Sequence, residues 1–367
     1  MRLFVDAHAF DGGISQGVTT YIEGLYKELV KTASDIDFYF AAQDTMRLES
    51  IFGTRENVHY VKYGSKNKYR RLAFEIPRIV RRLGIDAAHF QYTSPLVKRC
   101  KEIVTIHDVL FLDYPQYFPA SYYHSKKWLF GRSARRADLL LTVSEYSKER
   151  LERFYRPRKP VRITPNAVDE RYGLVRRSEA EALLDGRVGK YILYVSRVEP
   201  RKNHLLLLRA YVEGRFYERG YALVFIGKTS IPVPELHRYC EKLPEDIRQN
   251  VFFFEQKPFE ELLAWYKCAS LFVYPSIAEG FGIPPLEAAV AGVPCICSNR
   301  TAMQDFRFFG EGTYDPEDLD QTIEKIELGL SPAFRDPERL ERIRQAVERR
   351  YDWASIAKEY YAYLTDL

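Results

Sequence analysis

The 367-residue sequence lacks several features that would assign it to other classes of protein. No segment approaches the roughly eighteen uninterrupted apolar residues of a membrane-spanning helix. The first residues, Met-Arg-Leu-Phe-Val-Asp-Ala-His, lack the long apolar core of a signal peptide and predict a buried strand. The five cysteines are odd in number and have no zinc-site or redox-motif spacing, so we expect a reduced, cytoplasmic protein.

The glycine-rich loops lack the common nucleotide-binding patterns. Residues 11–17, Asp-Gly-Gly-Ile-Ser-Gln-Gly, have neither the Lys-Ser/Thr ending of a Walker A loop nor Gly-x-Gly-x-x-Gly spacing. Two adjacent glycines still allow the backbone to approach a phosphate or a sugar closely. By itself this loop is a weak signal.

Acidic residues are scarce in the first half of the chain. Residues 1–167 hold 28 Lys and Arg against 18 Asp and Glu, a balance of +10, whereas residues 168–367 hold 27 against 32, a balance of −5. The basic half suits an anionic membrane or acceptor, and solvated helix faces explain the same charge equally well. No nucleic-acid-binding motif accompanies the charge, so we expect no nucleic-acid partner.

The order of apolar runs predicts two α/β domains. The chain is longer than a typical single domain, and short apolar strands alternate with amphipathic helices throughout, which is typical of parallel sheets. The pattern restarts after Pro165–Asp169, so we place the boundary at residue 168. The expected strands are Leu3–Ala7, Phe38–Ala41, Val58–Val61, Ala87–Gln91, Ile103–Ile106, Leu139–Val143, Val161–Thr164, Tyr191–Val195, Ala222–Ile226, Val251–Phe254, Leu271–Tyr274 and Val293–Cys297, with a helix over Asn203–Tyr217.

Two further loops carry residues suited to a phosphorylated sugar ligand. Ser196–Asn203 follows a strand and offers Arg197 and Lys202, two cations that suit a diphosphate. Glu279–Glu287 places one carboxylate before a glycine-rich turn and a second in the first turn of a helix opened by paired prolines. Ligands of doubly wound sheets bind beyond the carboxyl ends of the strands, so we expect a site in the cleft between the domains.

Taken in this order and spacing, the three loops resemble those of retaining, nucleotide-sugar-dependent glycosyltransferases. The family is the glycosyltransferase family 4 type, group 1, which takes in sucrose and bacterial glycogen synthases and many mannosyl- and glucosyltransferases. Val104–Asp108, Val143–Ser147 and Tyr274–Ser276 support the resemblance, which covers nearly the whole chain.

The resemblance implies a GT-B fold: α/β, with two doubly wound Rossmann-like domains facing across a cleft that closes on the donor. It implies an acceptor-binding domain over residues 1–167 and a nucleotide-sugar domain over 168–352. A C-terminal helix, residues 353–367, is expected to pack back on the N-terminal domain.

The resemblance also assigns roles to matching residues. Arg197 and Lys202 resemble the pair that grips the donor diphosphate, Glu279 the group that holds hydroxyls of the transferred sugar, and His107 a histidine that reaches the donor sugar; these are the catalytic candidates. The donor-binding candidates are Gly13, Gly280, Phe281, Gly282 and Glu287, of which Glu287 resembles the glutamate that binds the ribose hydroxyls.

Three positions depart from the family pattern. Ser196 stands where many relatives have glycine, and Glu255 stands where glycine is common near the nucleobase, so the preferred base is not evident. The Pro-Glu usual near Met303–Asp305 is missing, without explanation from the sequence.

The predicted function is a retaining hexosyltransferase for cell-surface polysaccharide biosynthesis. It would move a hexose from a GDP-mannose or UDP-glucose type of donor to a hydroxyl of a glycan or lipid-linked acceptor. The nucleotide sugar is a co-substrate, and we expect no cofactor and no metal, because the two cations can stabilise the leaving diphosphate. Donor base, acceptor and oligomeric state stay open, as does peripheral contact with the inner face of an anionic membrane.

Three other functions were weighed. A non-catalytic GT-B module that binds a glycan or a partner predicts eroded phosphate contacts, but Arg197, Lys202, Glu279 and Glu287 are all present. A glycosidase needs a second carboxylate at the sugar. An epimerase or a phosphorylase of the same fold is the third, and nothing indicates the pyridoxal lysine that a phosphorylase requires.

Overall fold

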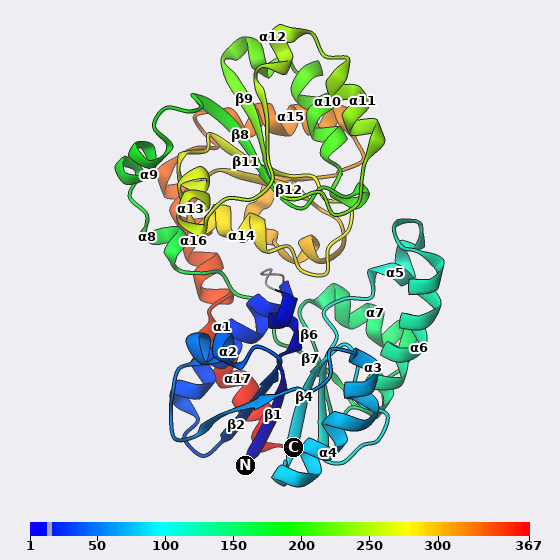
Figure 1. The fold of residues 1–367 in the computed structure, drawn as a ribbon. Helices are drawn as coiled ribbons and strands as arrows, with labels where there is room; N and C mark the ends of the chain where they lie inside the picture. Colours follow the sequence, from blue (N-terminus) through cyan, green and yellow to red (C-terminus); the bar gives the residue numbers. More distant parts are fainter. Residues whose placement is uncertain (13–16) are drawn as a thin grey trace. The chain divides into compact units, whose positions relative to one another are not determined.

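The computed structural model describes residues 1–12 and 17–367, and its chain divides into two compact units (Figure 1). Unit 1 comprises residues 1–167 together with 351–367, and unit 2 comprises residues 168–350. The C-terminal helix therefore belongs to unit 1, and the chain leaves unit 2 two residues before the expected boundary at 352. In the described part of the chain, no helix is long and apolar enough to cross a membrane.

Unit 1 is built on a sheet of seven parallel strands in the order β3-β2-β1-β4-β5-β6-β7. Its strands are β1 (Arg2–Asp6), β2 (Asp37–Ala42), β3 (Val58–Lys62), β4 (Ala87–Gln91), β5 (Lys101–Thr105), β6 (Leu139–Thr142) and β7 (Val161–Ile163). Its helices are η1 (His8–Gly12), α1 (Gly17–Thr32), α2 (Thr45–Phe52), α3 (Lys68–Arg70), η2 (Arg71–Glu75), α4 (Ile76–Leu83), α5 (Leu110–Asp113), η3 (Pro115–Tyr117), α6 (Ala120–Arg136), α7 (Glu145–Tyr155) and α17 (Trp353–Thr365).

Unit 2 is built on six parallel strands in the order β10-β9-β8-β11-β12-β13. Its strands are β8 (Lys190–Val195), β9 (Tyr221–Ile226), β10 (Val251–Phe254), β11 (Leu271–Tyr274), β12 (Cys295–Ser298) and β13 (Thr313–Tyr314). Its helices are α8 (Arg171–Leu174), α9 (Arg177–Leu184), η4 (Pro200–Lys202), α10 (His204–Glu213), η5 (Phe216–Arg219), α11 (Pro234–Glu241), α12 (Glu245–Arg248), α13 (Phe259–Cys268), α14 (Ile283–Val290), η6 (Thr301–Asp305), η7 (Arg307–Gly312), α15 (Leu319–Leu330) and α16 (Pro337–Arg350).

Strand order reverses once in each sheet. In unit 1 the chain builds outward from β1 to β3 on one side and then from β4 to β7 on the other; in unit 2 the reversal lies between β8 and β11. Loops leaving two such neighbouring strands diverge to opposite faces of the sheet, which opens a crevice at their carboxyl ends. Each unit therefore has one place where a ligand is expected.

The central strands of both sheets are buried on both faces, as their unbroken apolar runs predict. Side chains of β4 and β11 are buried along their whole length, and β1 is buried except at Arg2. The C-terminal helix α17 lies along α1 and completes this cover, visible as red beside blue in Figure 1.

Several expected elements differ from the observed ones by a few residues at an end, and two of these differences have a clear physical reason. The helix predicted over Asn203–Tyr217 ends at Glu213, because Arg215 takes a left-handed backbone with φ 55° and a new short helix starts at Phe216. The last predicted strand begins at Cys295 rather than Val293, after Pro294, which has no N–H to donate to a ladder.

Candidate functional site

The reversal point of unit 2 brings together the two loops that the sequence singles out. Strands β8 and β11 are hydrogen-bonded neighbours, with Leu271 opposite Ile192. The loop after β8 carries η4 with Lys202, and the loop after β11 carries Glu279 and leads into α14. The Ile277 N–H donates to the Arg201 carbonyl at 2.9 Å, which ties the two loops through their backbones.

Lys202 and Glu279 form a buried ion pair at this point, and each side chain is only 9% exposed. The Lys202 ammonium donates to Glu279 Oε1 and, at 3.1 Å, to the Tyr274 hydroxyl. The same carboxylate oxygen accepts from Ser276 at 2.6 Å and from Tyr274 at 3.0 Å. A buried charge is tolerated only when it is paired and hydrogen-bonded, and these contacts meet both conditions.

Arg201 belongs to the same cluster, although it was not among the residues predicted from the sequence. Its guanidinium donates to Glu279 Oε2 at 3.1 Å and to the Ala278 carbonyl at 2.6 Å, and it lies 2.6 Å from Glu199 Oε1. Its position in the sequence could have indicated this role, because Arg201 stands directly before Lys202 in a short helical turn. The family pattern drew attention to Arg197 instead.

The cluster keeps its central carboxylate ionised. Burial alone would raise the pKa of Glu279, but Lys202 and Arg201 outweigh it and hold that pKa below its usual range. Burial lowers the pKa of Lys202, and Arg201 adds to this effect while Glu279 opposes it. Two cations, Lys202 and Arg201, thus face two carboxylates, Glu279 and Glu199, in one buried cluster.

Arg197 lies apart from this cluster. Its side chain is 53% exposed, and its guanidinium comes no closer than 4.0 Å to Glu199. The loop that carries it packs against Gly227, whose φ is 155° and where a Cβ would lie 1.9 Å from the Ser196 carbonyl oxygen. The role of Arg197 at a diphosphate stays a prediction.

Gly280, Phe281 and Gly282 form the approach to helix α14. Gly282 has a φ of 98° at the N-cap, a conformation that favours glycine, and a Cβ there would meet Met303 Cγ at 3.1 Å. Met303 is fully buried, so the position where the family pattern departs is filled by a side chain that packs on this turn. Phe281 is buried against Phe306.

Glu287 lies one turn into α14, half-buried beside two tyrosines. The Tyr266 hydroxyl donates to Glu287 Oε2 at 2.7 Å, and Tyr172 also donates to the carboxylate. Burial raises the pKa of Glu287 to about 7, although both tyrosines act to lower it. A ligand whose hydroxyls donate to this carboxylate would favour its ionised form.

His107 belongs to unit 1 and lies two residues after the end of β5, the neighbour of β4 in the sheet. Its Nε2 lies 2.7 Å from Gln91 Oε1, so it carries its proton on Nε2. Gln91 Nε2 in turn lies 3.4 Å from His89 Nε2, and the His89 Nδ1 lies 2.7 Å from the Tyr26 hydroxyl. Burial lowers the pKa of both histidines to about 3, so His107 is neutral at physiological pH.

The reversal point of unit 1 holds a pocket of about 250 Å³. It is lined by residues that follow β1 and end β4, together with side chains from α1 and α3: His8, Ala9, Gly12, Val18, Thr19, Lys68, Gln91 and Tyr92. Gln91 therefore connects this pocket to His107. Gly13, the candidate in the neighbouring loop, lies outside the described residues.

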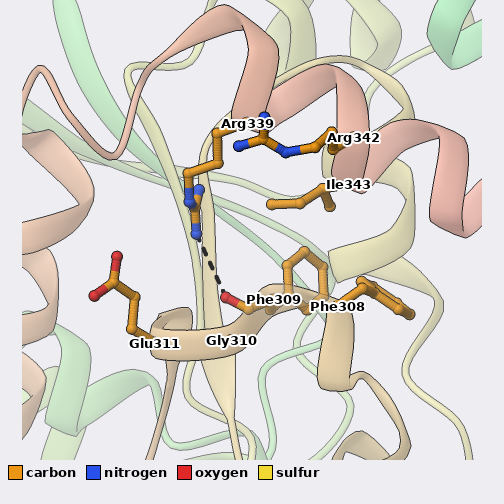
Figure 2. Close-up of a pocket in the computed structure, with 7 residues that line it drawn as sticks. All are labelled: Phe308, Phe309, Gly310, Glu311, Arg339, Arg342 and Ile343. Atoms are coloured by element: carbon orange, nitrogen blue, oxygen red, sulfur yellow. Dashed lines mark hydrogen bonds between the residues drawn. The ribbon is translucent and has the colours of Figure 1, made fainter.

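A second hollow, of about 330 Å³, lies between η7 and α16 in unit 2 (Figure 2). Phe308 and Phe309 form one side, and Arg339 donates to the Phe309 carbonyl at 3.4 Å. It contains none of the residues predicted from the sequence and does not lie at the reversal point. Over residues 1–12 and 17–367, no group of three or more His, Cys, Asp or Glu is placed to share a metal ion.

Comparison with known proteins identifies both halves of the chain. Residues 179–349 match the family model described as glycosyl transferases group 1, and residues 15–172 match that described as glycosyltransferase family 4.

One similar sequence is the O-antigen chain mannosyltransferase B of Escherichia coli. It is 32% identical over 231 residues, which span 60% of this chain and 58% of that protein. Among solved structures, sucrose-phosphate synthase from Thermosynechococcus elongatus superposes with a TM-score of 0.77 at 16% identity, covering 100% of this chain and 98% of that one. HepE of Anabaena, in complex with UDP and glucose, gives 0.76 at 16% identity, covering 100% and 99%. These structures share the fold.

Proposed function

We propose, from the premise that this chain belongs to the group 1 glycosyltransferases of GT-B architecture, that it transfers a hexose from a nucleotide-diphosphate sugar to an acceptor hydroxyl. The observation that carries the proposal is the buried Lys202–Glu279–Arg201 cluster at the reversal point of unit 2. A leaving diphosphate gains negative charge as the glycosidic bond breaks. Fixed cations in a site that excludes water stabilise that charge in the transition state.

Within this cluster Lys202 is the group that would contact the diphosphate. Glu279 accepts hydrogen bonds from Lys202, Arg201, Tyr274 and Ser276, so its first task is to hold the lysine in place. The backbone amides of Phe281 and Gly282 at the start of α14 supply donors for hydroxyls of the transferred sugar. Glu287 would accept from the ribose.

Mannose is the sugar that the sequence relatives favour. The similar protein of Escherichia coli is named as an O-antigen chain mannosyltransferase, so we propose GDP-mannose as donor and a cell-surface glycan, free or lipid-linked, as acceptor. The complex of HepE with UDP and glucose makes UDP-glucose the second donor to test. We propose a retaining, metal-independent reaction without a cofactor, in which Lys202 and Arg201 would supply the positive charge at the diphosphate.

The test is nucleotide release from a panel of UDP-, GDP-, ADP- and dTDP-sugars by the full chain, first without acceptor. We expect release from GDP-mannose, unchanged by a metal chelator. Lys202→Ala should lower turnover roughly 10²–10³-fold, the scale of one lost transition-state contact. Once an acceptor is found, the anomeric configuration of the product, read by NMR, decides whether the reaction retains.

Lys242→Ala is the matched control, because Lys242 is an exposed lysine of the same unit, at the end of α11. Its turnover should equal that of the wild type. Since removing one partner of a buried ion pair destabilises a protein by about 3–5 kcal/mol, Lys202→Ala must be compared at equal folded fraction. Near-normal turnover of folded Lys202→Ala would contradict the proposal that Lys202 contacts the donor diphosphate.

Unit 1 carries a face suited to an anionic membrane, and we propose that the protein acts peripherally at the cytoplasmic side. On α6, Trp128 is 60% exposed beside Lys127. One turn later Arg132 donates to the Leu96 carbonyl at 2.8 Å, which holds the exposed Leu96 near the same helix. Exposed aromatic and aliphatic side chains among lysines bind the interface of anionic bilayers.

A further inference from the structure

The pocket at the reversal point of unit 1 contains a cation without a counter-ion. Lys68, the first residue of α3, is half-buried and lines the pocket. Among the described residues, no carboxylate lies within ion-pair distance of its ammonium, and no hydrogen bond to that ammonium is found. A half-buried charge in this state is unfavourable, and a negative ligand would remove the cost.

Neighbouring charges increase the effect. Burial lowers the pKa of Lys68, and Lys126 of α6 and Arg71 lower it further, while Asp6 acts in the opposite direction. Asp6 is already bound, because it accepts from Tyr63 at 2.9 Å and lies 3.0 Å from His8 Nδ1. No ion pair of the described residues joins Asp6 to Lys68, so Asp6 acts on Lys68 only from beyond ion-pair distance.

Asp108 is another carboxylate, connected to the pocket through Tyr92. Asp108 Oδ2 accepts from Tyr92, a pocket residue, at 3.4 Å, and Asp108 Oδ1 accepts from the Leu110 N–H at 3.2 Å. Lys126 lies over the rings of Tyr122 and Phe130, at 5.5 and 5.8 Å, which leaves its charge without an anionic partner in these contacts. Of these charged groups Lys68 lines the pocket, and Lys126 lies close enough to lower its pKa.

The lining also suits a polar ligand of limited size. Gln91 and Thr19 are polar residues of the lining, and Tyr92 adds an aromatic ring. The volume of about 250 Å³ lies just below the roughly 300 Å³ at which pockets for drug-sized ligands begin. One phosphate-bearing group or one sugar fits, but not a length of glycan.

We propose that this pocket binds a phosphate or diphosphate group of the acceptor, with Lys68 as its contact and Lys126 as the second cation. The inference rests on the proposed function, since it assigns to the acceptor a charged group near the hydroxyl that is glycosylated. Two sources share this chemistry: a sugar phosphate, and a prenyl diphosphate that anchors the acceptor to a membrane.

Lysine reactivity tests the proposal directly at the residue. The full chain is acylated with a limiting reagent at mildly alkaline pH, and modification of each lysine is measured by peptide mass spectrometry. A bound phosphate should reduce acylation of Lys68 by about tenfold, because pairing with an anion favours the protonated, unreactive amine. Geranyl diphosphate and a hexose 1-phosphate are the two probes, and the one that protects at lower concentration identifies the source.

Two controls make the result decisive. Lys66 is exposed and two residues away, so its acylation should not change. Sodium chloride at matched ionic strength should not protect Lys68. The proposal is overturned when neither probe protects Lys68, or when chloride protects it equally. This measurement needs no turnover. Loss of Lys68 protection would therefore contradict the pocket proposal even if donor hydrolysis is observed, and absence of donor hydrolysis would contradict the proposed function even if Lys68 is protected.

Kinetics give the second measurement once an acceptor turns over. Lys68→Ala should raise the KM for a phosphate-bearing acceptor roughly 10–100-fold with a smaller change in kcat, the scale of one lost charged hydrogen bond. Lys68→Arg should restore most of the affinity, and Lys66→Ala should behave as wild type. An unchanged acceptor KM in Lys68→Ala would contradict the proposal.

Discussion

At the scale of single residues, the neutral side chain of Gln91 contacts a buried histidine, His107. It lines the pocket of unit 1 and holds His107 by its Nε2 at 2.7 Å. A neutral amide there leaves the buried His107 uncharged, with a pKa of about 3. A charge at position 91 would change this, because an opposite charge at such a distance shifts a pKa by about one to three pH units.

Gln91→Glu should therefore raise the pKa of His107 to between roughly 4 and 6. The sign follows from the carboxylate, which stabilises the imidazolium and so keeps the proton bound at higher pH. Histidine titration by NMR measures the shift. Gln91→Met removes the hydrogen bond without adding charge and should leave the pKa low; a Gln91→Glu variant that titrates like Gln91→Met would refute the assigned contact.

At the scale of secondary-structure elements, helix α17 packs closely against α1 at Gly24. A Cβ on Gly24 would lie 2.0 Å from Trp353 Cε2, far inside contact distance. The Tyr360 hydroxyl lies 3.1 Å from that of Tyr26 and 3.2 Å from His89 Nδ1, so the same pair of helices also shares a buried polar network. The C-terminal helix is thus an integral part of unit 1.

Gly24→Ala should destabilise unit 1 by about 1–3 kcal/mol, because the added methyl group displaces the Trp353 ring. This exceeds the roughly 0.5–1 kcal/mol that alanine gains over glycine inside a helix. The free energy of unfolding in urea is the measurement. Gly189→Ala, with no atom within 4 Å of the added Cβ, is the control and should stay within about 0.5 kcal/mol of wild type. A Gly24→Ala protein as stable as this control would contradict the observed packing.

At the scale of the whole molecule, charge separates the two halves. The first 167 residues carry a balance of +10, and the exposed Trp128 and Lys127 lie on a helix of that half. We therefore expect unit 1 to contact the bilayer. The same unit contains the pocket with Lys68 and the hydrogen-bond network of His107.

The full chain should co-sediment with phosphatidylglycerol vesicles and much less with phosphatidylcholine vesicles, and added salt should release it by screening the surface potential. Lys127→Ala should weaken binding about fivefold, since one lysine near an anionic surface contributes about 1 kcal/mol. Trp128→Ser should weaken it as well. Leu174→Ser alters an exposed apolar side chain of unit 2 and is the control. Equal binding by all three variants would place the membrane contact elsewhere.

The sequence by itself determined much of this protein. Its alternation of apolar strands and amphipathic helices predicted two parallel α/β units and most strand bounds, because that pattern reflects local burial. Residue type and spacing within single loops also predicted Lys202, Glu279 and Glu287 as site candidates. Such signals lie within a few residues of chain.

Tertiary structure decided what those residues touch. Arg201 lies on Glu279, 78 positions away, because β8 and β11 pair across the reversal of strand order. Gln91 acts on His107 because β4 and β5 are neighbours, and Lys68 enters a pocket with Gln91 because η1, α1, α3 and β4 meet there. Strand pairing and burial join segments distant in the chain, and no local pattern of residue types encodes which side chain then lacks a partner.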